Sequence, residues 1–173
     1  MEFRFGIKTN VMVGMCAVIG IFCWLGVTSS AFQKEKKRSM ATHASGTFDV
    51  KATPQAPDQN GADAAIGRFS LDKQFHGDLA GTSKGEMLAV GTAVEGSAGY
   101  VAMEKVTGTL NGRTGTFALQ HTGTMTRGAA ELNVSVVPDS GTGELNGLSG
   151  KMEIKITEGK HFYEFNYSIA PAP

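Results

Sequence analysis

Residues 96–150 read GSAGYVAMEKVTGTLNGRTGTFALQHTGTMTRGAAELNVSVVPDSGTGELNGLSG and carry the strongest structural signal in the chain. Glycines divide it into short runs in which apolar and polar residues alternate. The phrase G-x-L-N-G-x-x-G occurs twice, at Gly108–Gly115 and Gly143–Gly150. Asn-Gly between alternating runs is a strong hairpin signal, because a type I′ turn needs positive φ at both central residues. The stretch therefore predicts antiparallel β-sheet, with hairpin turns at Asn111-Gly112 and Asn146-Gly147.

Alternating runs of the same kind continue on both sides of this stretch. About eight of them lie between residues 44 and 170, joined by glycine turns, and no helical periodicity interrupts them. Eight strands can close on themselves and leave no exposed edge, and such a barrel holds either side chains or one small ligand. We predict an all-β domain over residues 44–170, folded as a closed antiparallel eight-stranded barrel.

The beginning of the chain has a different composition. Val11–Val27 is a run of 17 apolar or glycine residues that follows Arg4 and Lys8. As a helix the run would span about 26 Å, the short limit for crossing a bilayer. Ser29-Ser30-Ala31 offers small residues for a cleavage after Ala31. We predict an N-terminal hydrophobic helix over residues 1–31, as a signal peptide or membrane anchor, and a basic tether over residues 32–43.

This leader predicts a location. If it is cleaved or serves as an anchor for export, the barrel is periplasmic or otherwise extracytoplasmic. The alternative is a membrane-anchored chain with a cytoplasmic barrel, because four basic residues follow the apolar run and outweigh the two that precede it.

Composition argues against several classes of function. Lysine plus arginine equals aspartate plus glutamate at 16 each, so no basic field exists that would hold nucleic acid. Both cysteines, Cys16 and Cys23, lie in the leader, so the barrel has no disulfide, thiolate ligand or cysteine nucleophile. His76, His121 and His161 follow no ligand spacing. We therefore predict no metal and no cofactor.

Several short motifs together resemble a known family. They are Phe48-Asp-Val, Lys73-Gln-Phe-His-Gly77, Gly99-Tyr-Val-Ala-Met-Glu104, Leu119-Gln-His-Thr-Gly123 and Val137-Pro-Asp-Ser-Gly-Thr-Gly-Glu-Leu. The combination is similar to a family of small, uncharacterised bacterial proteins with the barrel of plant allene oxide cyclases, over about residues 46–169. The resemblance implies an eight-stranded barrel that is often a homo-oligomer. It implies no reaction, because a fold does not carry a function.

Glu104 is the first candidate site residue. It shares the parity of Tyr100, Ala102 and Val106, an otherwise apolar face. On the inner wall of a barrel its carboxyl would have a raised pKa and would act as an acid, a base or a polar anchor. The alternatives are that this face points outward, or that Glu104 pairs with Arg113 or Lys105.

The other candidates surround it. Pairing through Asn111-Gly112 makes partner numbers sum to about 223, so Glu104 falls opposite Leu119. Gln120 and His121 are adjacent and only one can face inward; parity with Phe117 and Leu119 favours His121, as a catalyst or as a hydrogen-bonded core residue. Tyr100 and Tyr163 would line a pocket or close the barrel ends.

Three functions compete at this point. The first is an exported or membrane-anchored barrel that binds a small apolar or amphipathic ligand through these candidate residues. The second is a structural or interaction barrel with a filled lumen. The third is an isomerase- or cyclase-type enzyme that uses Glu104. Cavity volume separates the second from the others, and a raised carboxyl pKa would favour the third over the first.

Overall fold

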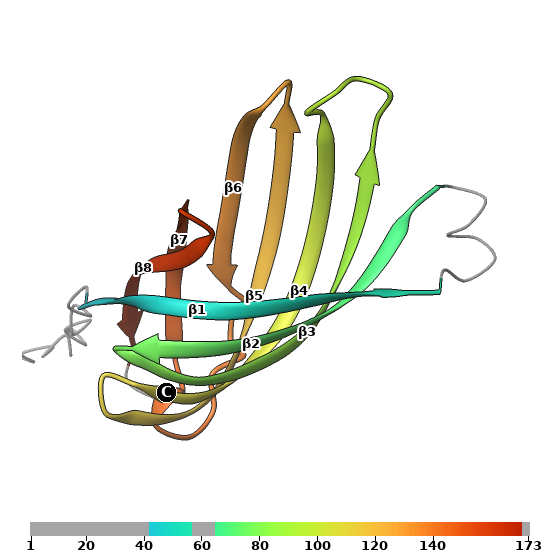
Figure 1. Ribbon diagram of the computed structural model, residues 1–173. Coiled ribbons are helices and arrows are strands. Elements are labelled where there is room, and N and C mark those ends of the chain that lie inside the picture. Colours follow the sequence, from blue (N-terminus) through green and yellow to red (C-terminus); the bar gives the residue numbers. More distant parts are fainter. Residues whose placement is uncertain (1–41, 57–64, 171–173) are drawn as a thin grey trace, which may run out of the picture. The chain divides into compact units, whose positions relative to one another are not determined.

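The computed structural model describes residues 42–56 and 65–170, and these form one closed antiparallel barrel in which the strands pair in the order of the chain. The predicted barrel is confirmed. Its strands stand side by side from β3 to β6, while β1 and β2 cross below them (Figure 1). The elements are β1 (Thr42–Gln55), β2 (Gly67–Gly77), β3 (Leu79–Gly91), β4 (Ala98–Leu110), β5 (Arg113–Thr126), β6 (Ala129–Val136), a 3₁₀ turn η1 (Gly143–Leu145), β7 (Leu148–Thr157) and β8 (Lys160–Ile169).

The predicted leader helix, its cleavage site and most of the tether lie outside the described residues. Within the ranges that the structure describes, no helix is long and apolar enough to cross a membrane. β1 begins at Thr42, so His43 belongs to the first strand and not to the tether.

The β4–β5 hairpin follows the predicted register. Asn111 and Gly112 have φ values of 46° and 80°, as a type I′ turn requires, and Glu104 lies opposite Leu119. A two-residue turn with both φ values positive recurs at Arg127-Gly128 and at Glu158-Gly159.

The second G-x-L-N-G-x-x-G phrase is not a hairpin, and this prediction was wrong. Gly143–Leu145 forms the 3₁₀ turn, and Asn146 has φ −59° and ψ 133° before Gly147 at φ 78°, which is type II turn geometry. The chain after β6 instead runs along the free edge of β5. The amide of Val137 donates to the carbonyl of Ala118 at 2.9 Å in this segment. A loop held by β5 therefore joins β6 to β7.

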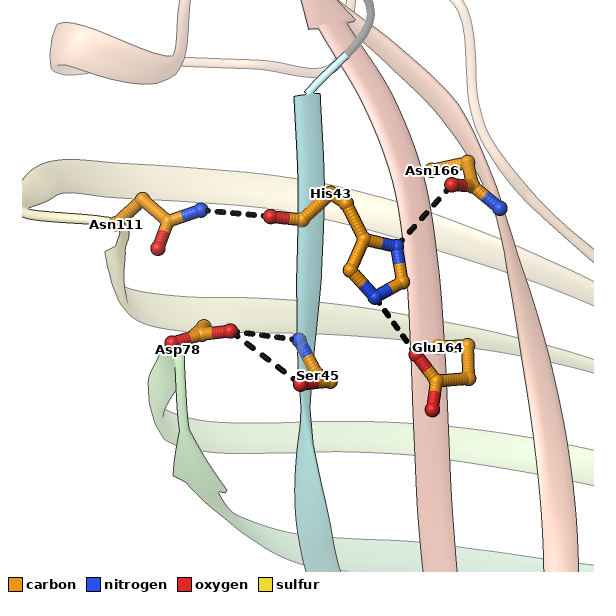
Figure 2. Close-up of polar contacts among 6 residues, drawn as sticks. All are labelled: His43, Ser45, Asp78, Asn111, Glu164 and Asn166. Carbon is orange, nitrogen blue, oxygen red and sulfur yellow. Dashed lines mark hydrogen bonds and ion pairs between the residues drawn. The ribbon is translucent and has the colours of Figure 1, made fainter.

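The start of the first strand is held by polar contacts to β8 and to the β2–β3 and β4–β5 turns (Figure 2). His43 contacts Glu164 at 2.7 Å through Nε2 and Asn166 at 3.2 Å through Nδ1. Asn111 Nδ2 donates to the carbonyl of His43 at 3.1 Å, and the amide of Ser45 donates to Asp78 at 2.9 Å. His43 and Glu164 are largely exposed, so we interpret these contacts as holding the start of β1 in place and not as a functional site.

Inward-facing side chains are packed at one end of the barrel and open at the other. On β6, Val136 and Val134 are buried while Leu132, on the same face, is 42% exposed. The same change occurs along β2 and β4, where burial ends at Leu71 and Ala102. We call the packed end the closed end and the open end the mouth. The core of the closed end includes four contacts between aromatic rings: Phe48–Phe75, Phe75–Tyr163, Phe117–Phe165 and Phe165–Tyr167.

One junction of the barrel is much shorter than the others. β6 and β7 pair only at Val134↔Met152 and Ser135↔Lys151, whereas β7 and β8 pair along ten residues. Toward the mouth, β6 and β7 therefore diverge without a ladder between them (Figure 1). We call this the β6–β7 seam.

Candidate functional site

A buried polar cluster lies in the wall between the core and the mouth. Glu104 is 2% exposed and accepts three hydrogen bonds. Lys73 Nζ lies 2.9 Å and His121 Nε2 2.8 Å from its Oε1, and Ser83 Oγ donates to its Oε2 at 2.7 Å. All three partners are also buried. The predicted inward orientation of Glu104 is confirmed, and its predicted alternative partners, Arg113 and Lys105, are not the ones it uses.

The cluster results from ordinary strand alternation on four neighbouring strands. Lys73 comes from β2, Ser83 from β3, Glu104 from β4 and His121 from β5. Cross-strand pairing brings Lys73 opposite Ser83 and Ala102 opposite His121. Inward positions on adjacent strands are within reach of long side chains, so one ammonium and one imidazole converge on one carboxylate.

Lys73 is held from two sides. Its Nζ lies 4.9 Å from the ring centroid of Phe48 and 5.9 Å from that of Phe75. Aromatic faces attract a cation, and the Glu104 carboxylate neutralises it. A lysine is thus tolerated in the wall because both its charge and its hydrocarbon stem have partners.

The pKa of Glu104 moves in the direction opposite to our prediction. Burial alone would raise the pKa of this carboxyl, as predicted from sequence. The hydrogen bond from His121, the charges of Lys73 and His121, and the hydrogen bond from Ser83 together outweigh burial and lower the pKa from 4.5 to about 2. Glu104 is therefore a fixed anion and a poor proton acceptor near neutral pH.

Tyr100 lies on the mouth side of this cluster. Burial, and then the negative charge of Glu104, raise the pKa of its phenol. Its ring covers Gly123 on β5, where a Cβ would fall 2.2 Å from a ring carbon. Among the described residues, no group hydrogen-bonds the phenol oxygen of Tyr100 or Nδ1 of His121. Two polar atoms near the mouth thus retain hydrogen-bonding capacity.

Two other candidates lie elsewhere. Gln120 is exposed on the outer face of β5, so its candidacy for an inner site is wrong; His121 occupies the inward position, as parity favoured. Tyr163 belongs to the closed end, where its hydroxyl accepts a hydrogen bond from the amide of Leu79 at 2.8 Å. The structure therefore brings together Glu104, His121 and Tyr100 and places Gln120 and Tyr163 outside this group.

Sequence reasoning missed Lys73 and Ser83. The signal for Lys73 was present, because it shares the parity of Phe69, Leu71 and Phe75 in RFSLDKQF. Ser83 gave a weaker signal, because a small hydroxyl residue between glycines is common in any strand.

The described residues contain no group of three or more His, Cys, Asp or Glu side chains that is arranged to hold a metal ion. The polar cluster offers one carboxylate and one imidazole, and the carboxylate is already occupied by a lysine. Its chemistry is that of a charged, hydrogen-bonded wall.

The comparisons with known proteins agree with this architecture. The family model described as "Protein of unknown function (DUF3224)" matches residues 44–167. The chain is also similar to the crystal structure of a protein of unknown function from the DUF3224 family of Shewanella oneidensis MR-1. The identity is 52%, the match covers 77% of this chain and 100% of that one, and the TM-score is 0.72.

No curated protein matched this chain. The likeness to allene oxide cyclases stays a prediction, since neither match tests it. The family match covers nearly all of the barrel, and the similar crystal structure carries the same family name. The chain therefore belongs to the DUF3224 family of proteins of unknown function.

Proposed function

We propose that the protein binds a small amphipathic molecule in the mouth of the barrel. This proposal rests on one observation: the close packing of inward-facing side chains ends at a charged cluster. Below that cluster the side chains fill the barrel, and above it the inward side chains are partly exposed. Binding sites typically combine apolar walls with a few polar groups in fixed positions.

The apolar part of the ligand would contact inward-facing residues at the mouth. Phe69, Met87 and Tyr100 are half-buried there, and Leu132 is exposed on the same inner surface. Covering these side chains removes apolar area from water and supplies the affinity, at about 25 cal/mol for each Å².

The polar part would meet the phenol of Tyr100 and the imidazole of His121. The phenol can donate a hydrogen bond, and Nδ1 of His121 is the ring atom that Glu104 leaves free. Because Glu104 and Lys73 are already paired, a ligand with one hydroxyl, carbonyl or ether group fits better than one that carries an uncompensated charge.

Binding is favoured over catalysis by the state of Glu104. A general base at neutral pH needs a pKa near the working pH, whereas the pKa of this carboxyl is about 2. We therefore rank an isomerase- or cyclase-type enzyme below a binding protein, with a structural barrel as the outcome if no ligand is found.

The test combines native mass spectrometry with a fluorescent probe. Protein purified without denaturation is expected to carry an added mass that disappears on unfolding. The uncharged amphipathic probe N-phenyl-1-naphthylamine should bind the wild type and bind Leu132→Asp at least tenfold more weakly.

The matched control is Phe162→Asp. Phe162 is also exposed, at 39%, but it lies on the outer face of β8, so its replacement should leave probe binding unchanged. Equal weakening by both variants, or no added mass together with no probe binding, would reject the mouth as a site.

We further propose that residues 1–31 direct the barrel to the cell envelope, by export or by anchoring. The support is the uncharged apolar run described above. Cell fractionation with intact-mass measurement tests it: a mature chain beginning at Phe32 supports cleavage, and a protease-protected, membrane-bound full chain supports the cytoplasmic orientation. A full-length chain found only in the soluble fraction would refute both.

A further inference from the structure

Four large apolar side chains lie together on the outer wall of the barrel. Leu88, Val90, Val101 and Met103 are each between 41% and 53% exposed. Leu88 and Val101 are directly opposite each other on β3 and β4, and Val90 and Met103 lie two residues away on the same outer face. They form almost half of the exposed large apolar residues of the described chain, so the exposure is concentrated. We call these four residues the outer strip.

The outer strip borders a hollow in the surface. A depression of about 820 Å³ extends over β3 to β6 and includes Leu88, Val90 and Val101. Its lining also contains Thr122, Thr124, Glu131 and Asn133, which occupy outward positions of β5 and β6. Tyr100 and Leu132, which belong to the mouth, also line it, so the depression takes in residues of both faces of the wall.

Two charged side chains mark opposite ends of this surface. Lys105 lies on β4 below Met103, and Glu131 lies on β6 in the row of Val90 and Gly99. Neither has an ion pair among the described residues, whereas the nearby charges on β2 and β3 are paired as Arg68–Glu86 and Lys84–Asp72. Six residue steps along the strands place Lys105 and Glu131 about 20 Å apart, too far to pair within one molecule.

We propose that the outer strip is the contact surface for a second copy of this chain, packed face to face about a two-fold axis. The axis runs across the strands between Val101 and Met103. Rows above the axis then lie over rows below it, so Val101 of each copy packs on Met103 of the other. Leu88 and Val90 pack on the side-chain stems of Glu86 and Lys84 of the other copy. Lys105 of one copy comes over the row of Gly99, from which its side chain reaches toward Glu131 of the other.

Charge and symmetry together favour a second copy over another partner. An isologous contact places the same patch on both sides, so a lysine at one end and a glutamate at the other are satisfied twice in one dimer. Gly99 has no side chain in that row and leaves space for the incoming lysine.

The experiment is a charge exchange read by sedimentation equilibrium of the full chain. The wild type should be a dimer. Lys105→Glu and Glu131→Lys should each raise the dimer dissociation constant at least fivefold, because each creates two like-charge contacts. The double variant should return to within about threefold of the wild type, which a non-specific contact would not do.

Further variants separate the outer strip from other surfaces. Val101→Lys places a charge at the centre of the strip and should raise the dissociation constant about 100-fold, while Phe162→Asp on β8 should not change it. Unchanged circular dichroism shows that each variant is folded. A monomeric wild type, an oligomer insensitive to Val101→Lys, or a failure of the double exchange to restore association would each overturn the proposal.

Discussion

Tyr163 and Tyr100 both face inward, at the closed end and at the mouth of the same barrel. Burial raises the pKa of both phenols. At the closed end, the hydroxyl of Tyr163 is hydrogen-bonded to Leu79 and its ring lies edge-on to Phe75 at 5.9 Å. At the mouth, the hydroxyl of Tyr100 has no hydrogen bond among the described residues. The same residue type thus stabilises the fold at one end and stays available at the other.

This contrast indicates how stability is distributed. The closed end contains the fully buried rings, whereas the mouth ends in partly exposed side chains above a charged wall. Regions that bind ligands are typically drawn from the less stable parts of a structure. We therefore expect substitutions at the two ends to have different effects.

The largest difference should come from apolar truncation. Phe165→Ala removes a fully buried ring at the closed end and should destabilise the barrel by about 3–5 kcal/mol. Leu132→Ala at the mouth should cost less than about 1 kcal/mol, because this side chain is already exposed to water. Urea unfolding measures both. Similar losses would show that the two ends are equally packed.

The polar cluster between the two ends should make stability depend on pH. Because the pKa of Glu104 is about 2 in the folded chain against 4.5 ordinarily, its contribution is complete above pH 4.5 and is lost as the pH falls to 2. At about 1.4 kcal/mol for each pKa unit, the loss is about 3 kcal/mol. We expect the free energy of unfolding, measured in urea at several pH values, to fall over this range.

The control for the pH effect is Lys73→Met combined with Glu104→Gln. This double variant removes both charges, so that neither is left buried without its partner. Its stability should fall less steeply than that of the wild type between pH 4.5 and 2, with other carboxyls contributing equally to both. Parallel curves for the two proteins would contradict the role assigned to Glu104.

The two tyrosines give a smaller and more specific comparison. Tyr163→Phe leaves the amide of Leu79 without its acceptor and should cost about 1–2 kcal/mol. Tyr100→Phe should change stability by less than about 0.5 kcal/mol but should weaken probe binding. Thermal unfolding and probe titration on the same preparations test this. The comparison fails if Tyr100→Phe is the more destabilising change or leaves probe binding intact.

The smallest effect concerns the turn that sets the register. Gly112 has a φ of 80° and no atom within 4 Å of an added Cβ, so Gly112→Val is strained only by its backbone conformation. It should cost slightly more than about 1 kcal/mol. Gly91→Val is the matched control, because Gly91 also has open space but no positive φ. An unchanged unfolding midpoint for Gly112→Val would contradict this reading.

Local chemistry made part of this structure predictable. The Asn111-Gly112 turn fixed the β4–β5 register, and strand alternation placed Glu104 and His121 inward. The same dipeptide at Asn146-Gly147 gave a wrong hairpin prediction, because the preceding loop pairs with β5 and so prevents a two-strand hairpin. The direction of the Glu104 pKa shift was wrong for a related reason. The pKa of Glu104 is lowered first by His121, and then also by Lys73 and Ser83, which come from strands whose register has no Asn-Gly signal.

The β6–β7 seam has a consequence for motion. Ala129–Asn133 and Glu153–Thr157 lack a common ladder at the mouth, so this junction should separate before any other. Amide hydrogens that face the seam should exchange with solvent faster than those inside the β4–β5 ladder. Glu131, Glu153 and Lys155 border the seam, and charges on such edges discourage another strand from adding there. We therefore expect the barrel to widen sideways at the mouth while the closed end stays intact, so that the proposed ligand could be broader than the resting rim.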